Sequence, residues 1–290
     1  MHESPTNPQI IWRTRTREFD LTHRGAVMGI VNVTPDSFSD GGRFANVASA
    51  LAHADRMIAH GAEIIDVGGE STRPGAEPVD EQEESRRVLP IITELAKRRG
   101  HGERFVISVD TMKPAVARAA VRAGASIIND VGGFRDAGMI AAAKESGAGV
   151  VIMHMQGEPR TMQEAPHYAD VCGAVREFFC HSLQRCVASG VPATHTAFDP
   201  GIGFGKTPRH NLDLLQRMNE LAIPGRPLVV GVSRKSFIGK ALGLSASEDR
   251  EWPTVALTCH SRERGARVFR VHDVKPNVEA LRMTEAILGT

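Results

Sequence analysis

The sequence is poor in the residues that build disulfide frameworks and zinc sites. It contains 4 cysteines in 290 residues, and no two of them form a C-x-x-C pair. Cys172, Cys180 and Cys186 fall within one predicted helix, and Cys259 stands alone. Such spacing matches neither a metal-binding cluster nor the disulfide pattern of a small secreted domain. We therefore expect four reduced cysteines, partly buried in helices.

The chain also lacks an excess of charge. Lys and Arg total 35 and Asp and Glu total 34, so the formal net charge is +1. A nucleic-acid backbone is held by a broad cationic field, which this balance does not supply. We expect no nucleic-acid partner, and a local cluster of residues must hold any anion that binds.

Long apolar runs are missing as well. No stretch approaches the roughly 20 residues that cross a bilayer, and the first residues do not follow the basic, apolar and small-residue order of a signal peptide. These absences predict a cytoplasmic protein with no membrane partner.

The chain is rich, by contrast, in joints between helices and strands. Gly-Ala followed by an apolar, β-branched run occurs four times, at residues 61–67, 124–129, 147–152 and 265–271. Glycine closes helices because it tolerates a left-handed backbone. Four further short apolar runs, at residues 27–33, 105–109, 196–198 and 228–232, are typical of strands covered on both faces.

Helical patterns lie between these strands. Asn46 precedes an apolar stripe, and Asp80 with Glu83 resembles a capping box. Proline stands where a first helical turn should begin at Pro114, Pro208 and Pro276. Strand and helix thus alternate about eight times, which predicts an α/β fold of the (β/α)8 TIM-barrel type. An open doubly wound sheet is the alternative, and it would need fewer units.

The first 25 residues form an extension ahead of the barrel, which we assign to residues 26–290. Residues 12–21 alternate polar and apolar side chains, which predicts a small hairpin or plug. Residues 1–8 are expected to be mobile.

Polar residues gather where the predicted strands end. A single one is most often a loop cap or a satisfied structural group, but a whole ring of them at one mouth indicates a ligand, since buried carboxylates need partners. The ring comprises Asn32, Asp66, Asp110, Asn129, Asp130, His154, Asp199, Ser233, Lys235, Ser236, Arg270, His272 and Asp273.

Glycine-rich stretches accompany these ends. Residues 201–207 finish in Gly-Lys-Thr like a phosphate loop, but Pro200 stands where that motif requires its first glycine, so the motif fails. Glycines at 68–69 and 132–133 are explained by turn geometry as readily as by a ligand. Residues 34–42 and 71–75 are small and polar, and we interpret them as flaps that close over a substrate.

The predicted strand ends carry a series of motifs: MGIVNVTPDSFSDGG at 28–42, DVGGESTRPG at 66–75, SVDT at 108–111, INDV at 128–131, MHMQG at 153–157, DPGIGFGK at 199–206, GVSRKSF at 231–237 and RVHD at 270–273. In these motifs the chain resembles the dihydropteroate synthases, enzymes that join a dihydropterin methyl diphosphate to 4-aminobenzoate and release diphosphate. The match runs in order from about residue 27 to the C-terminus. Ile202 departs from it, because many members carry an aromatic residue there, which predicts a changed pocket wall.

The resemblance implies a pterin subsite and roles for its residues. The ring edge would be read by Asp110, Asn129, Asp199 and Lys235, with Met153 against a ring face. For the diphosphate it implies Asn32 with Mg²⁺, and Arg270 and His272 as direct partners. The 4-aminobenzoate would lie near Thr72, Arg73, Pro74, Phe204, Lys235 and Ser236, with its carboxylate by the Ser236 helix end. The catalytic set is Asn32, Arg73, Lys235, Arg270 and His272.

The family's chemistry needs no covalent enzyme nucleophile. The diphosphate leaves first, with Mg²⁺ and basic residues stabilising it, and the amine then attacks. Binding of the diphosphate is expected to order the flaps and so complete the 4-aminobenzoate pocket. The resemblance also implies a homodimer and a sulfonamide target. A pterin-dependent methyltransferase domain and a catalytically inactive pterin-binding homologue are the alternatives.

Overall fold

Eight parallel strands close into a barrel in the computed structural model, which describes residues 9–33, 42–72, 75–99, 104–246 and 248–289. The strands neighbour one another in the order β10-β3-β4-β5-β6-β7-β8-β9. β10 pairs with both β3 and β9, so the sheet has no free edge. This closure confirms the predicted TIM barrel and rules out the open doubly wound sheet.

The barrel strands are short and buried on both faces, as their apolar composition predicts. They are β3 (Ala26–Asn32), β4 (Ile64–Gly68), β5 (Val106–Asp110), β6 (Ile127–Asp130), β7 (Gly149–Met153), β8 (Thr196–Asp199), β9 (Leu228–Val230) and β10 (Ala266–Val271). Each of the eight runs identified in the sequence overlaps one of them.

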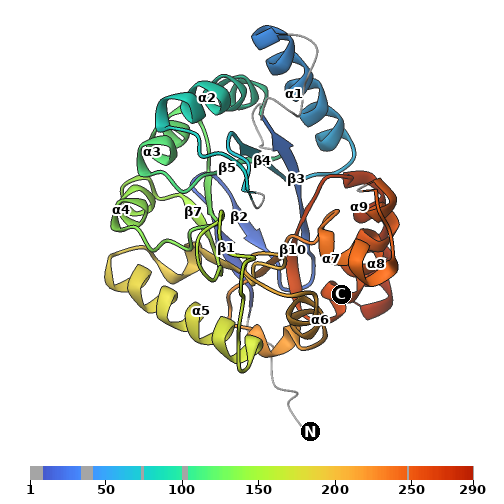
Figure 1. The fold of residues 1–290 in the computed structure, drawn as a ribbon. Helices are drawn as coiled ribbons and strands as arrows, with labels where there is room; N and C mark the ends of the chain where they lie inside the picture. The colour runs from blue at the N-terminus through green and yellow to red at the C-terminus, as the bar shows by residue number, and fades with distance from the viewer. Residues whose placement is uncertain (1–8, 34–41, 73–74, 100–103, 247, 290) are drawn as a thin grey trace, which may run out of the picture.

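Helices surround the barrel as an outer ring (Figure 1). They are α1 (Gly42–Ala59), α2 (Glu81–Arg98), α3 (Pro114–Ala123), α4 (Ala137–Ser146), α5 (Val171–Ala188), α6 (Pro208–Gln216), α7 (Ser236–Leu242), α8 (Glu251–Glu263) and α9 (Val274–Leu288). Both α7 and α8 lie between β9 and β10. The large core fills the space between strands and helices and runs continuously around the ring.

Of the five predicted helix starts, three are confirmed, Pro276 is the third residue of its helix, and the start at Asn46 is wrong. The Asp80 side chain accepts a hydrogen bond from the Glu83 amide at 2.7 Å, and Pro114 and Pro208 are the first residues of their helices. By contrast, α1 begins at Gly42, so Asn46 lies inside the helix. Asparagine is only mildly unfavourable in a helix, and a cap-type residue therefore does not require a helix end.

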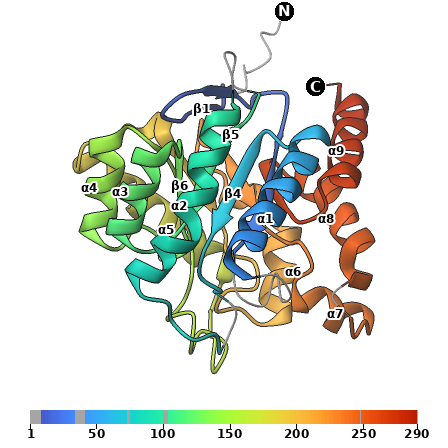
Figure 2. The ribbon, with the colours of Figure 1, turned by 90° about the horizontal axis from the view of Figure 1, so that it is seen from above.

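A two-stranded hairpin closes the N-terminal end of the barrel. β1 (Ile11–Arg13) pairs antiparallel with β2 (Glu18–Asp20), and Trp12 faces Phe19 across the pair. Both side chains are buried against residues of the barrel strands, among them Met28 and Val151. The Trp12 indole also donates to the His195 carbonyl at 3.0 Å. The predicted plug is thus confirmed, and Figure 2 shows β1 at one end of the barrel.

All four cysteines are free thiols, as predicted. Cys172 and Cys186 are buried on α5, Cys180 is half-buried on the same helix, and Cys259 is half-buried on α8. Burial raises the pKa of Cys172 and of Cys186 to about 11, so both stay protonated and unreactive near neutral pH. Within the described ranges, no helix combines the length and apolarity needed to cross a bilayer.

Candidate active site

Strand register brings three polar side chains into one row at the C-terminal mouth of the barrel. Asn32 pairs with Gly68, Gly68 with Asp110, and Asp110 with Asn129. Gly68 lacks a side chain between its neighbours, and a Cβ there would lie 3.7 Å from both Asn32 Oδ1 and Asp110 Oδ2. Asn32 and Asp110 therefore flank an open slot above the glycine. Residues from four motifs that are far apart in the sequence therefore meet in this row.

The Arg270 guanidinium ties this row to the other side of the mouth. Its Nε donates to Asp66 Oδ2 at 2.6 Å, and its Nη2 donates to Asp110 Oδ2 at 2.7 Å. Asn129 Nδ2 donates to the same Asp66 oxygen at 3.1 Å. Neither arginine contact uses Nη1. Arg270 can therefore hold two carboxylates and still offer a donor to an anion.

Burial and charge set the protonation of this cluster. Burial raises the pKa of Asp110 to about 7; the positive charge of Arg270 opposes this rise, and the negative charge of Asp66 adds to it. Burial alone would lower the pKa of Arg270, but the carboxylates of Asp66 and Asp110 outweigh that effect and raise it. The arginine therefore stays charged, while Asp110 is poised to respond to a ligand or to pH.

Asp199 ends β8, and Lys235 lies in the loop after the neighbouring strand β9, close enough for each charge to affect the pKa of the other. Asp199 Oδ1 accepts from the Gly201 amide at 2.7 Å. A Cβ on Gly231 would lie 3.8 Å from both Asp199 Oδ2 and the Arg270 side chain, so this glycine keeps the space between them open. Burial lowers the pKa of Lys235 to about 8 and raises that of Asp199, and the opposite charge of each partner limits both shifts.

Methionines build an apolar wall beside these polar groups. Met153, Met155 and Met162 are buried in one cluster with Val131, and Met112 and Phe204 pack against it. Met153 thus lies on the wall where the resemblance places a ring face. Met112 was not identified from the sequence, although a flexible thioether directly after a barrel strand suits such a wall.

Phe204 and Lys235, which the resemblance assigns to the 4-aminobenzoate subsite, lie close together. The Lys235 ammonium lies 4.7 Å from the centre of the Phe204 ring and donates to the Ile202 carbonyl. Ser236 follows as the first residue of α7. The Ile202 side chain itself is buried in the large core. The residue at this position therefore shapes the site through its backbone carbonyl.

The remaining predicted residues occupy two other parts of the mouth. His272 follows β10, and its Nδ1 lies 2.9 Å from Ser233 Oγ. Thr72 lines a hollow of about 170 Å³ together with Met112, and this hollow lies between the loops that follow β4 and β7. Arg73 and Pro74 lie outside the described residues, as do residues 34–41. Closure of the two predicted flaps therefore stays a prediction.

Three of the polar strand ends serve the scaffold. Asp130 accepts from the amides of Gly132 and Phe134, both at 2.7 Å, so its carboxylate caps its own loop. Asp273 holds Arg234 through two hydrogen bonds of 2.8 and 3.0 Å. His154 is buried against other side chains. The contacts of these three residues fit the interpretation of a loop cap or a satisfied structural group.

Asp66, Ser233 and Lys206 have no assigned role in the sequence-based site. Asp66 is fully buried and accepts from both Arg270 and Asn129, and its Oδ1 has no hydrogen-bond partner among the described residues. The signal for Asp66 was present, because an acidic residue inside an apolar strand needs a partner. The partner lies 204 residues away, which only the closed barrel reveals.

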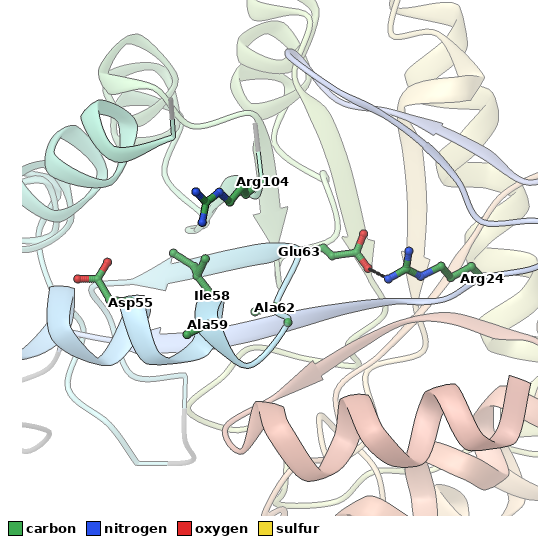
Figure 3. A pocket seen from close by; sticks show the side chains of 8 residues that line it. Arg24, Asp55, Ile58, Ala59, Ala62, Glu63 and Arg104 are labelled. Carbon is green, nitrogen blue, oxygen red and sulfur yellow. Dashed lines mark ion pairs between the residues drawn. The ribbon is translucent and has the colours of Figure 1, made fainter. Parts of the chain in front are cut away.

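One hollow of the described structure lies away from this chemistry. It has a volume of about 530 Å³ and lies at the N-terminal ends of β3, β4 and β5, lined by Arg24, Asp55, Glu63, Arg104 and the end of α1 (Figure 3). Glu63 is already paired with Arg17, Arg24 and Arg282, and Asp55 is paired with Arg98. Charges satisfied in this way fit a structural role, and active sites of such barrels lie at the opposite face.

Comparison with known proteins identifies the family. The model of the family described as "Pterin binding enzyme" matches residues 28–272. The chain belongs to this family. The dihydropteroate synthase of Escherichia coli strain K12 is 48% identical over 270 residues, covering 93% of this chain and 94% of the relative. The prediction of a dihydropteroate synthase, a transferase of folate biosynthesis, is thereby confirmed at the level of the family.

Two solved structures extend this similarity to the fold. The dihydropteroate synthase of Yersinia pestis, in a sulfonamide drug complex, is 45% identical and superposes with a TM-score of 0.89, covering 97% of this chain and 100% of the other. The enzyme of Xanthomonas albilineans with 4-aminobenzoic acid is 41% identical with a TM-score of 0.89, covering 97% and 99%. Both matches span the barrel and the hairpin.

Proposed function

We propose that this chain condenses a dihydropterin methyl diphosphate with 4-aminobenzoate, forming dihydropteroate and diphosphate. The observation that carries the proposal is the Arg270 bridge between Asp66 and Asp110, because it holds a cation beside Asp110, the expected pterin acceptor, at the mouth of the barrel. Membership of the family supports the same reaction.

The pterin subsite would lie between Asp110, Asn129, Asp199 and Lys235. A pterin presents N–H donors on one edge and a carbonyl beside them. Carboxylates of Asp110 and Asp199 accept from that edge, and the Lys235 ammonium donates to the ring oxygen and nitrogen. Asn129 Nδ2 donates one of its two hydrogens to Asp66, so its second N–H and its Oδ1 would serve the ligand. Met153 then packs against a ring face.

The diphosphate would lie beside Asn32, Arg270 and His272. Mg²⁺ prefers a few hard oxygen ligands and keeps phosphate oxygens and waters for the rest. The Asn32 amide oxygen suits that preference, and the described residues contain no cluster of three His, Cys, Asp or Glu side chains that would enclose a metal without a substrate. Bound there, Mg²⁺ would stabilise negative charge on the leaving diphosphate.

The residues of this chain would act mainly by electrostatics and positioning. The bond between the pterin methylene carbon and the diphosphate oxygen breaks, and its electron pair leaves with the diphosphate. Arg270 Nη1 and the His272 imidazole would meet the growing charge, which is where such groups accelerate a reaction. The amine nitrogen of 4-aminobenzoate then bonds to the carbon and loses a proton.

The 4-aminobenzoate would lie on the Phe204 side of the mouth. The ring has apolar surface available on Phe204 and on the methionine wall. Lys235 and the Ser236 hydroxyl supply polar contacts for the carboxylate, and Thr72, Arg73 and Pro74 would close the other side. Arg73, which carries the only charge in that trio, also belongs to the proposed catalytic set.

We further propose a cytoplasmic homodimer with the small-molecule substrates as its other partners. Large apolar side chains are exposed on the last three helices: Leu242 on α7, Trp252 on α8, and Met283 and Ile287 on α9. Exposure of several large apolar groups in one region is typical of a protein–protein contact. A second copy of the chain would cover them.

Turnover of the two substrates, with Mg²⁺ and with a chelator, tests the activity. A methyltransferase domain would instead transfer a methyl group to a corrinoid, and an inactive homologue would bind a pterin without releasing diphosphate. The groups assigned to the diphosphate, Arg270 and His272, argue against both alternatives.

His272→Ala tests the diphosphate site more cleanly than a change at Arg270, because Arg270 also holds Asp110. We expect kcat/KM for the pterin diphosphate to fall about 10²-fold, with little change in the affinity for a pterin that lacks phosphates. The exposed His181 provides a control, as His181→Ala. An equal loss in both quantities would assign His272 to the pterin or to the fold.

A further inference from the structure

The loop at residues 201–206 does not match the phosphate-loop motif. Its glycines alternate with the apolar residues Ile202 and Phe204, and it ends at Lys206. Gly201, Gly203 and Gly205 all have positive φ, at 65°, 85° and 58°. A Cβ on Gly201 would lie 1.9 Å from the His154 carbonyl oxygen, and one on Gly205 would lie 2.5 Å from the Gln156 carbonyl oxygen. The glycines therefore let this loop lie directly on the segment that follows β7.

Two lysines hold the carbonyls between these glycines. Lys235 donates to the Ile202 carbonyl, and Lys206 donates to the Phe204 carbonyl at 2.9 Å. The Lys206 ammonium is buried and lies 3.1 Å from His154 Nδ1 and 3.3 Å from the His154 carbonyl oxygen. Burial lowers the pKa of His154 to about 3, so its imidazole is neutral and can accept the hydrogen bond.

Lys206 has no carboxylate within ion-pair distance among the described residues, so its burial is costly. Its three contacts join His154, which follows β7, to Phe204, whose ring lies against the Lys235 ammonium. A purely apolar residue could fill the same volume without the desolvation cost, but it could not hold the Phe204 carbonyl.

We propose that Lys206 is a positioning residue for the second substrate: by clamping the Phe204 carbonyl to His154, it sets the placement of the Phe204 ring and so the affinity for 4-aminobenzoate. The inference rests on the proposed function, which puts 4-aminobenzoate on Phe204. Lys206 touches no substrate in this scheme and acts through the loop.

Lys206→Met tests the clamp, since methionine fills most of the lysine volume without a donor. We expect KM for 4-aminobenzoate to rise about tenfold, the effect of losing one hydrogen bond from a charged group, with KM for the pterin diphosphate within about twofold. Lys275→Met, at an exposed lysine of α9, is the control. An unchanged KM for 4-aminobenzoate would overturn the proposal and leave Lys206 with a structural role only.

A pair of variants at the other end of the clamp keeps the test decisive if Lys206→Met does not fold. Asparagine places an acceptor oxygen near the position of histidine Nδ1, whereas leucine has none. We expect His154→Leu to raise KM for 4-aminobenzoate and His154→Asn to restore it toward the wild-type value. Equal values for the two variants would count against the clamp.

Phe204→Ala separates this inference from the proposed function. If Phe204→Ala raises KM for 4-aminobenzoate and Lys206→Met does not, the clamp is wrong and the pocket is correct. If neither variant changes KM for 4-aminobenzoate, the assignment of the pocket to Phe204 is wrong, and the inference fails with it.

Discussion

Arg270 joins Asp66 of β4 to Asp110 of β5 through one planar guanidinium, with its Nε 2.6 Å from the first carboxylate and its Nη2 2.7 Å from the second. The rigid fork of arginine allows both contacts at once, whereas lysine presents a single point of charge. The bridge therefore depends on the shape of the side chain as well as on its charge.

Arg270→Lys should lower kcat/KM for the pterin diphosphate about 10- to 100-fold, because at least one charge-assisted hydrogen bond is lost. Steady-state kinetics with each substrate varied will measure this effect. Arg13→Lys is the matched control, since Arg13 pairs with Glu18 at 2.6 Å on the exposed hairpin. Wild-type kinetics for Arg270→Lys would show that charge alone suffices.

The residues in this bridge show why sequence reasoning reached the barrel but only part of the site. The strands and helix starts follow from local signals, such as Gly-Ala joints and prolines in first turns, which report on neighbours in the chain. Pairing of Arg270 with Asp66 depends on barrel closure and on strand register across 204 residues, which no local pattern encodes. Asp130 shows the opposite limit: its position at a strand end indicated a ligand, but its carboxylate accepts hydrogen bonds from the amides of its own loop.

The glycine loop shows the same limit at shorter range. Its Gly-x-Gly-x-Gly-Lys pattern is visible in the sequence, but the pattern by itself only excludes a phosphate-loop motif. The contacts of Gly201 with His154, and of Lys206 with Phe204, depend on the close approach of two strand ends. Such an approach is a tertiary property, and glycine content alone does not reveal what comes near.

Asp110→Asn should weaken pterin binding while the protein stays folded. An amide in place of the carboxylate turns one acceptor into a donor and removes the charge, which costs about 1.5 to 3 kcal/mol of binding free energy. Isothermal titration calorimetry with a pterin lacking phosphates will measure this cost. Asp55→Asn, which alters an exposed carboxylate paired with Arg98, serves as the control. Unchanged affinity would remove Asp110 from the pterin site.

The raised pKa of Asp110 predicts that pterin affinity depends on pH. Its pKa is raised from 3.8 to about 7, so the free protein carries a proton there below pH 7 and an acceptor carboxylate above it. The N–H edge of a pterin favours the ionised form, and affinity should therefore rise between pH 6 and pH 8. Measuring the pH dependence of pterin affinity in Asp110→Asn isolates the contribution of this carboxyl. The variant should lose the rise between pH 6 and pH 8 but keep any pH dependence that comes from titration of the ligand itself.

Gly201→Ala should be far more destabilising than Gly243→Ala. Both residues have positive φ, at 65° and 70°, so both substitutions carry the strain of a left-handed alanine, about 1 kcal/mol. Only at Gly201 does the new Cβ meet a backbone atom, the His154 carbonyl oxygen at 1.9 Å, whereas nothing lies within 4 Å at Gly243. Urea unfolding of the two variants will compare them, and similar losses of stability would mean that the loop moves aside freely.

Lys206→Met should change the pH dependence of stability in a defined direction. Burial lowers the pKa of Lys206 from 10.5 to about 7, so between these values the unfolded chain binds a proton that the folded chain does not. Stability therefore rises with pH across this window, and the cost of the buried ammonium is complete below pH 7 and lost towards pH 10.5. Methionine does not titrate, so the variant lacks this pH dependence. The loss of the lysine hydrogen bonds shifts its curve of stability against pH by a constant amount. The Tm of the variant minus that of the wild type should thus be most positive at pH 6.5 and fall steadily to pH 9.5.

Lys275→Met should show a flat difference in Tm from the wild type over the same pH range. A flat or rising difference for Lys206→Met would mean that the lysine keeps an ordinary pKa in the folded protein.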